Sequence, residues 1–249
     1  MAKDLVHDEA VTTGIPEVPV TQQRPVPVNL DQYIKNPGAP RATRAVSKEK
    51  PHGSDNSADN RTVLQQHVDF WDFDHDGFIY PMDTYNGFRK LGYNVVVSFL
   101  AIFFIHGSFS YASQGTWLPD PFFSINTNNI HKTKHGSDSE VYDTEGRFVP
   151  EKFEELFTKF DRRNRKGLDF HEMWELSEAN RNIIDPTGWT AEKLEWWATW
   201  FIAGDKNGLV SKETIRGVYD GTWFYQQADK IKAEKARKAP SNGRNGHQD

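Results

Sequence analysis

The sequence predicts a mainly α-helical protein that combines a helix–loop–helix unit, an apolar helical segment and a C-terminal helical region. The first unit is indicated by a cation-type loop, DFDHDGFIYPMD at residues 72–83, which lies between two helical patterns. The apolar segment is indicated by the run NVVVSFLAIFFIHGSFSYA at residues 94–112. Helical periodicity then returns between residues 147 and 225, where FVPEKFEELFTKFD is strongly amphipathic.

Composition divides the 249 residues into five regions. Residues 1–58 are rich in proline and polar side chains, so we expect them to be mostly disordered. The helix–loop–helix unit is expected at 59–91, the apolar segment at 92–124 and the C-terminal helical region at 125–226. Residues 227–249 form a basic tail that we expect to be flexible or a solvated helix. A minority of such tails bind anionic membranes.

Charge and cysteine content exclude several classes of protein. The balance of 30 basic and 35 acidic residues gives no overall basic field, so we expect no nucleic-acid partner. The absence of cysteine excludes disulfides, zinc–thiolate sites, thiol nucleophiles and thiolate-ligated haem. If the protein carries haem, its axial ligand should therefore be His, or less often Tyr or Met. The N-terminus lacks the apolar core of a signal peptide.

The loop at residues 72–83 matches an EF-hand calcium loop position by position. Gly77 falls where the loop needs its sharp turn, and an apolar residue follows at position 8. The last position is usually a bidentate Glu but is Asp here, whose shorter arm predicts weaker calcium binding and better tolerance of magnesium. The expected metal ligands are the carboxylates of Asp72, Asp74, Asp76 and Asp83 and the backbone carbonyl of Phe78.

Two further loops have EF-hand spacing but lack the ligands. Residues 161–172 keep both end carboxylates, yet Arg163 and Arg165 occupy the inner ligand positions. Residues 203–214 lack the first and last ligands. Since both loops should fail to hold a cation, we interpret them as structural EF-hand relics and expect a single cation in the whole chain.

The apolar segment leaves two structures open. Apart from Ser98, its unbroken apolar part runs from Val95 to Ile105, which is short for a simple span of about 20 residues. His106 and the two residues after it interrupt that run. The segment could be a buried helix of a globular core, or a hairpin that dips into a lipid surface. The following TWLPDPFF predicts a turn, because two prolines lie between bulky aromatic residues.

Nine histidines are present, and spacing alone assigns none of them a function. His67 lies on the predicted helix that enters the calcium loop, but a lone helical histidine is more often structural than ligating. His131 and His135 are four residues apart and could share one helix face, a spacing that suits a metal. No HExxH signature accompanies them.

Four stretches together resemble the caleosin family over roughly residues 60–226. They are LQQHVDFWDFDHDGFIYPMDTYNGFRKLGYN, WLPDPFF, NIHKTKHGSDSEVYDTEGRFVPEKFEELF and DKNGLVSKETIRGVYDGTWF. The resemblance implies a calcium-binding protein of lipid droplets and endoplasmic reticulum membrane. It also implies a peroxygenase with haem b, which takes oxygen from a fatty-acid hydroperoxide and passes it to an unsaturated lipid or another acceptor.

The resemblance places the family's haem histidines, which would also be catalytic, on His67 in LQQH and His135 in KHGSD. It implies that calcium fixes the helix carrying His67 and so controls haem binding and activity. Which histidine is proximal and which is distal stays open. The family's proline knot is reduced here: Pro119 and Pro121 match its centre, but Gln114 and another non-proline replace expected prolines. We therefore expect shallow rather than deep anchoring in a phospholipid monolayer or membrane.

Two other functions remain compatible with the same features. A non-catalytic, calcium-responsive coat protein of lipid droplets would use the same loop and apolar segment, but it would need no haem histidines. A soluble calcium sensor fits less well, because sensors usually carry paired working loops. Substrate preference and a homo-oligomeric state are left open.

Overall fold

The structure is a computed structural model that describes residues 43–54 and 60–238. Its helices are α1 (Val63–Asp69), α2 (Pro81–Leu91), α3 (Val95–Ser113), the 3-10 helix η3 (Thr127–Thr133), α4 (Pro150–Phe160), α5 (Phe170–Ala179), α6 (Pro186–Ala203), α7 (Lys212–Tyr219) and α8 (Thr222–Lys238). Its strands are β1 (Phe78–Ile79), β2 (Ile125–Asn126), β3 (Gly167–Asp169) and β4 (Leu209–Ser211). The mainly helical fold class is thus confirmed.

Local sequence signals set the limits of the helices around the acidic loop. Thr62 caps α1 in a reciprocal arrangement with Gln65, in which each side chain accepts the other's backbone N–H. Pro81 occupies the first turn of α2. Gly92 ends α2 with φ at +104°, a conformation that glycine adopts without strain. Asn94 then caps α3 by accepting the Val97 N–H at 2.9 Å.

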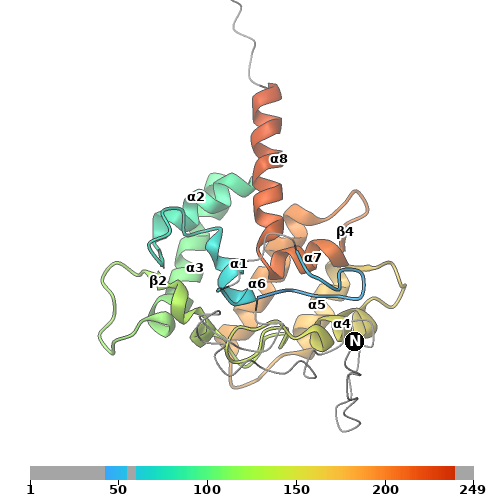
Figure 1. Cartoon of the computed structure of the whole chain (residues 1–249), viewed down its shortest axis with the longest axis horizontal. Coiled ribbons are helices and arrows are strands. Elements are labelled where there is room, and N and C mark those ends of the chain that lie inside the picture. Colours follow the sequence, from blue (N-terminus) through green and yellow to red (C-terminus); the bar gives the residue numbers. More distant parts are fainter. Residues whose placement is uncertain (1–42, 55–59, 239–249) are drawn as a thin grey trace, which may run out of the picture.

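The loops between helices are joined in pairs by two short antiparallel sheets. β3 pairs with β4, which links the loops of the α4–α5 and α6–α7 units. β1 pairs instead with β2, so that the acidic loop is joined to the segment that follows α3. In Figure 1, α2, α3 and the long loop before β2 form one side of the molecule, whereas α4, α5 and α7 form the other. The main core lies on that second side and contains Phe148, Phe153, Leu168, Met173, Leu176 and Ile215 among its buried residues.

The two ends of the described chain are more structured than composition alone suggests. Residues 43–54 pack against the body, where Ala45 is 1% exposed. The rest of the region expected to be mostly disordered lies outside the described residues. At the other end, α8 continues as a helix to Lys238 and extends away from the body. Residues 239–249 of the expected flexible tail lie outside the described residues.

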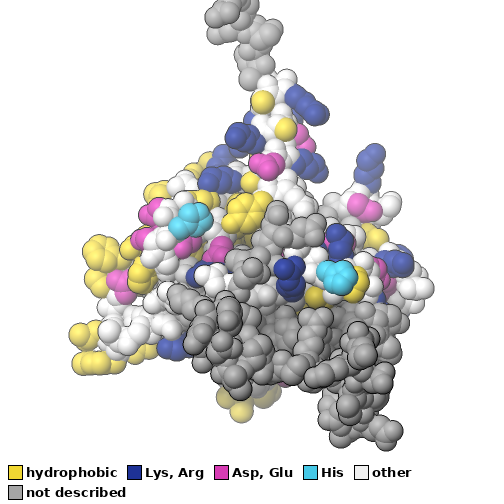
Figure 2. Space-filling model, in the orientation of Figure 1, with side chains coloured by type: hydrophobic (Ala, Val, Ile, Leu, Met, Phe, Trp, Pro, Cys, Tyr) yellow, Lys and Arg dark blue, Asp and Glu magenta, His cyan; other side chains and the backbone are white. Residues whose placement is uncertain are grey.

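α3 decides between the two structures left open for the apolar segment. The helix does not end at the polar residues after Ile105 but continues to Ser113, for 19 residues. By length and composition alone it could cross a membrane, and only 17% of its most apolar window is buried. A buried core helix is therefore excluded. Figure 2 shows hydrophobic side chains gathered on the side of the molecule formed by α2, α3 and the following loop.

Candidate functional site

Three carboxylates of the loop between α1 and α2 converge. One oxygen from each of Asp72, Asp74 and Asp76 lies within 4.8 Å of the others. Asp72 is buried, and its Oδ1 atom has no hydrogen-bond partner, while Oδ2 accepts the Gly77 N–H at 3.0 Å. Burial raises the pKa of Asp72, and the neighbouring carboxylates add to this effect. A divalent cation would supply the missing partner of Oδ1 and reduce the repulsion between the three carboxylates.

Asp83, the last expected carboxylate ligand, is not part of this cluster. Asp83 is the third residue of α2, where its Oδ2 accepts the Tyr80 N–H at 2.9 Å. It therefore caps the helix in the absence of a cation. Phe78 belongs to β1, and its N–H donates to Asp76 Oδ1 at 2.7 Å. The structure thus gathers three of the predicted ligands and places the last one in a capping role.

The acidic loop is fastened to the chain that follows α3. The buried Thr127 donates its backbone N–H to Gly77 O at 2.9 Å and its hydroxyl to the same oxygen at 3.1 Å. Ile79 lies opposite Ile125 in the β1–β2 pair. Thr127 also begins η3, which leads directly to the segment containing His135. The loop is consequently connected to His67 through α1 and to His135 through η3.

His67 presents a free ring nitrogen to its surroundings. Its Nδ1–H donates to the carbonyl of Val218 at 2.7 Å, because a carbonyl can only accept. This fixes the neutral tautomer that has a lone pair on Nε2. Burial lowers the pKa of His67, although the Val218 carbonyl and Asp220 oppose the shift. Phe224 and Tyr142 flank the ring, with centroids 5.2 and 6.4 Å away. A neutral imidazole held in this way is suited to coordinate a metal through Nε2.

His135 has the opposite arrangement at its ring. Its Nδ1 accepts the Ser137 N–H at 3.2 Å, so a neutral ring carries its proton on Nε2. Asp185 Oδ2, which has no hydrogen-bond partner, lies 3.4 Å from the same Nδ1. Gly188 allows this approach, since a Cβ there would lie 2.5 Å from the imidazole. His67 and His135 thus differ in protonation geometry and in the residues that hold them.

His131 and His135 do not share a helix face. η3 includes His131 but ends at Thr133, and the chain then leaves the helix through Lys134. The i, i+4 expectation fails because it assumed a continuous α-helix, whereas this segment is a short 3-10 helix. Both histidines nevertheless line one cavity of about 620 Å³, together with charged residues such as Lys134 and Asp138.

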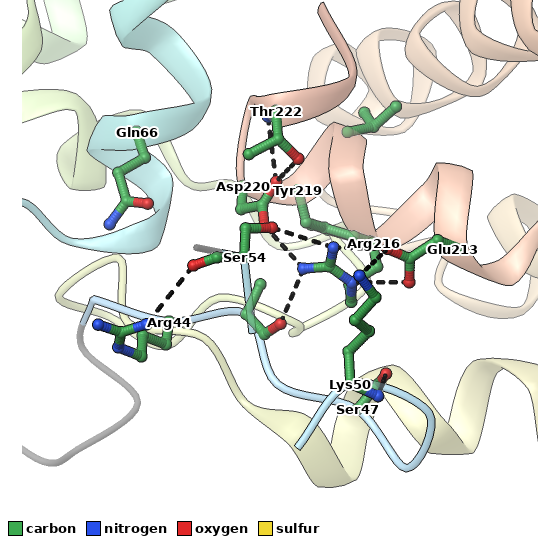
Figure 3. A network of polar contacts seen from close by, with 12 residues as sticks. Arg44, Ser47, Lys50, Ser54, Gln66, Glu213, Arg216, Tyr219, Asp220 and Thr222 are labelled. Carbon is green, nitrogen blue, oxygen red and sulfur yellow. Dashed lines mark hydrogen bonds and ion pairs between the residues drawn. The ribbon is translucent and has the colours of Figure 1, made fainter. Parts of the chain in front are cut away.

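A buried ion pair on α7 supports His67, and sequence reasoning missed it. Arg216 Nη1 donates to Asp220 Oδ2 at 2.8 Å and to the Ala45 carbonyl at 3.0 Å. Nη2 donates to Ser54 Oγ at 3.0 Å and to Glu213 at 2.7 Å. Figure 3 shows the guanidinium between α7 and the N-terminal segment. The i, i+4 spacing of Arg216 and Asp220 was the available signal in the sequence.

This network fixes the backbone to which His67 is bonded. Val218, whose carbonyl accepts from His67, lies between Arg216 and Asp220 on the last turn of α7. α1 also packs closely on the junction of α7 and α8, where a Cβ at Gly221 would lie 2.4 Å from the Gln66 carbonyl. Gly221 has φ at +77°, so both space and backbone conformation favour glycine there.

Four of the five buried residues of α3 are polar, whereas its exposed residues are mostly large and apolar. Ser98 and Ser113 are fully buried, and His106 is 2% exposed. His106 Nδ1–H donates to the Phe123 carbonyl at 2.6 Å, and its Nε2 accepts the Thr84 hydroxyl at 2.8 Å. The residue that interrupts the apolar run thereby ties the end of the turn to α2. Exposed apolar residues on α3 and the turn are Val95, Val96, Phe99, Leu100, Phe103, Phe104, Tyr111, Trp117, Leu118, Phe122 and Phe123. Polar residues buried and large apolar residues exposed on the same helix are typical of contact with lipid.

Comparisons with known proteins agree with this architecture. The family described as "Caleosin related protein" matches residues 59–228. A protein of Lilium longiflorum named "Peroxygenase" is 40% identical over 92% of this chain and 95% of its own. "Probable peroxygenase 4" of Arabidopsis thaliana is 40% identical over 71% of this chain and 91% of its own.

A further relative differs in its name. The "Probable inactive peroxygenase-like protein" of Arabidopsis thaliana is 35% identical over 64% of this chain and 76% of its own. No solved structure shows a significant match. Because the family match covers more than half of the chain, and the lily protein is similar along almost its whole length, the protein belongs to the caleosin family.

Proposed function

We propose that the protein is a calcium-dependent haem peroxygenase that uses fatty-acid hydroperoxides to epoxidise or hydroxylate lipids. The names of the lily protein and of probable peroxygenase 4 support the reaction class. The single observation that carries the proposal is His67, a neutral imidazole with Nδ1–H bonded to a carbonyl and Nε2 left free. That arrangement has no structural need for the Nε2 lone pair, whereas an axial ligand requires it.

The two histidines fit haem b in different roles. His67 fits the axial ligand, because its Nε2 is unprotonated. His135 would contact the peroxide instead, because its neutral form carries a proton on Nε2 that can be donated to a hydrogen bond. Haem, when bound, supplies the oxygen-transfer chemistry. His135 would donate a hydrogen bond from its Nε2–H to the peroxide. Two permanent histidine ligands would leave the peroxide no place to bind.

The loop at residues 72–83 would act as an EF-hand that binds one calcium ion. Asp72, Asp74, Asp76 and the Phe78 carbonyl supply oxygens, and Asp83 closes the site when it leaves its capping position. Calcium would hold the loop against Thr127 and so fix both segments that carry the histidines. The connections through α1 and η3 support calcium-dependent activity.

The exposed apolar face of α3 supports a position at the surface of lipid droplets and endoplasmic reticulum membrane. Burying each large apolar side chain of that face contributes about 1.5–3 kcal/mol. His106 holds the end of the turn to α2, which favours shallow insertion of the α3 hairpin into a phospholipid monolayer.

A calcium-responsive coat protein without enzymatic activity is the second candidate. The relative named "Probable inactive peroxygenase-like protein" gives this candidate a specific basis. Both candidates need the acidic loop and α3, so only the histidines distinguish them. A coat protein gains nothing from the free Nε2 of His67.

An absorption spectrum of purified protein, after expression with added haem, tests the proposal. We expect a Soret band and turnover of cumene or fatty-acid hydroperoxide, and chelation of calcium should reduce the turnover. His67→Ala should lose the Soret band. His135→Ala should keep haem but lose turnover, whereas the neighbouring His131→Ala should keep both. Wild-type protein without haem absorbance and without turnover would favour the coat protein.

A further inference from the structure

A second cavity, of about 340 Å³, lies between α3 and α6. Ile105 and Phe109 line it from α3, and Ala191 and Leu194 line it from α6. Its volume falls within the usual range of small-molecule sites, which is about 300–1,000 Å³. It shares no lining residue with the cavity that contains His131 and His135. It is thus a separate space beside the helix whose outer face is apolar.

The cavity is continuous with the apolar surface of α3. Phe104 lines the cavity and is also 54% exposed on that surface. Ile183 and Ile184, just before α6, are 80% and 88% exposed, and Pro186 lines the cavity at the start of that helix. An acyl chain could therefore pass from a lipid phase into the cavity along apolar side chains without crossing water.

The charge of the residues that line the cavity indicates which ligands it can hold. Glu195 is the one charged side chain among the lining residues, and no Lys, Arg or His lines this cavity. A haem group, with its two propionates, and a free fatty-acid carboxylate would both meet a negative charge with no cation. A neutral polar group on an acyl chain would instead meet a carboxyl that can share a hydrogen bond.

Glu195 also connects the cavity to the surroundings of His67. The Glu195 side chain is exposed at the surface of the molecule. The protein around it nevertheless desolvates the carboxyl and raises the pKa of Glu195 to about 7, and Asp138 adds to the effect. Desolvation thus favours the protonated carboxyl, which can donate a hydrogen bond. Glu195 helps to raise the pKa of Tyr142, whose ring lies 6.4 Å from that of His67.

We propose that the cavity between α3 and α6 binds the acyl chain of a lipid hydroperoxide that enters from the lipid phase, with Glu195 hydrogen-bonded to the hydroperoxide group. The proposal rests on the peroxygenase function for the identity of the ligand. The chain's carboxylate or ester end would stay outside, near Phe104, and its hydroperoxide would lie beside Glu195. The site should therefore prefer a chain with a hydroxyl or hydroperoxide to the same chain without one.

Photo-crosslinking to the detergent-solubilised haem protein tests the site without turnover. The probe is the methyl ester of a hydroxy fatty acid with a diazirine on its chain, and the modified peptides are identified by mass spectrometry. We expect labelling of the segment 186–195, and an unlabelled hydroxy ester should compete for it. Ala191→Phe fills the cavity and should abolish this labelling with an unchanged Soret band. The control Ala233→Phe, on the exposed part of α8, should label normally.

Glu195 is tested by substitutions that keep the cavity open. Loss of one neutral hydrogen bond in Glu195→Leu should weaken competition by the hydroxy ester about tenfold, while Glu195→Gln should retain most of it. Normal labelling of Ala191→Phe, or equal competition by esters with and without a hydroxyl, would overturn the proposal. Loss of the Soret band in a helical Ala191→Phe would also overturn it, since the cavity would then hold haem. Labelling without hydroperoxide turnover in the wild type would reject the peroxygenase function but keep the lipid site.

Discussion

Two loops of the molecule, at residues 72–83 and 161–172, each connect a pair of helices. They differ in how the negative charge of their carboxylates is balanced. In the first loop, three carboxylates converge and the buried Oδ1 of Asp72 has no partner. In the second, the Arg165 guanidinium donates to Glu172 at 2.5 Å and to Asp169 at 2.7 Å. The first loop is thus suited to a cation from solution, whereas the second contains a positive charge of its own.

The first carboxylate of the second loop is also satisfied internally. Asp161 accepts the backbone N–H groups of Arg165 and Lys166 at 2.8 and 2.7 Å. Burial alone would raise the pKa of Asp169, but the Glu172 N–H and the Arg165 guanidinium hold it below its usual value. The comparison teaches that this loop geometry forms without a metal ion where one side chain supplies the positive charge.

Removal of the Asp72 carboxylate should have the largest effect on the difference in cation binding between the two loops. Asp72→Ala takes away the buried ligand, so we expect calcium affinity to fall about 100-fold or more, to no measurable site by calorimetry. The matched control is Asp161→Ala in the second loop, which should leave the single site intact. Undiminished binding by Asp72→Ala would show that calcium occupies another part of the chain.

Removal of the Arg165 guanidinium should destabilise the loop at residues 161–172. Arg165→Met removes the cation closest to Asp169 and to the buried Glu172, and leaves only the exposed Arg163 at 3.9 Å from Asp169. We expect a loss of about 3 kcal/mol in urea denaturation at pH 7. The folded pKa of Asp169 is lowered, so its stabilising contribution is present above the unfolded pKa and is lost as pH falls through the folded value. The deficit should therefore shrink in acid. Arg163→Met, at an exposed side chain, should change stability little.

Glu192 extends the comparison to a buried carboxyl without any cation. Its Oε2 has no hydrogen-bond partner, and burial raises its pKa to about 8. The folded protein then holds a proton that the unfolded chain releases above about pH 4.5, so stability should fall as pH rises from that value to about 8. Glu192→Gln should gain about 2 kcal/mol at pH 8 and little at pH 4.5. The exposed Glu234→Gln should show no such difference, and a parallel pH profile of the two variants would contradict this reasoning.

Asp83→Glu should produce the smallest change. The longer arm can reach the cation with two oxygens, and we expect calcium affinity to rise about tenfold while magnesium gains less. Glutamate at this helical position can also keep the capping contact with Tyr80. Calorimetry with both ions measures the effect, and Glu172→Asp in the second loop is the control that should leave binding unchanged. Equal affinities for the wild type and Asp83→Glu would mean that this residue does not reach the ion.

The sequence by itself determined the features that depend on neighbouring residues. Thr62, Pro81 and Gly92 set helix limits through local hydrogen bonds and backbone conformation. The ligands of the loop at residues 72–83 follow from fixed spacing, because a tight loop brings alternate side chains to one point. The absence of cysteine favoured histidine as the expected haem ligand, and motif resemblance then indicated His67 and His135.

Only the tertiary structure decided which distant groups satisfy these local units. His67 is oriented by Val218, 151 residues away, and the acidic loop pairs with β2 rather than with another such loop. α3 turns its serines and His106 inward and its large apolar residues outward, which periodicity could not show because the helix is apolar on most sides. Such contacts depend on how whole elements pack, since a buried polar group takes whatever partner the fold brings within hydrogen-bonding distance.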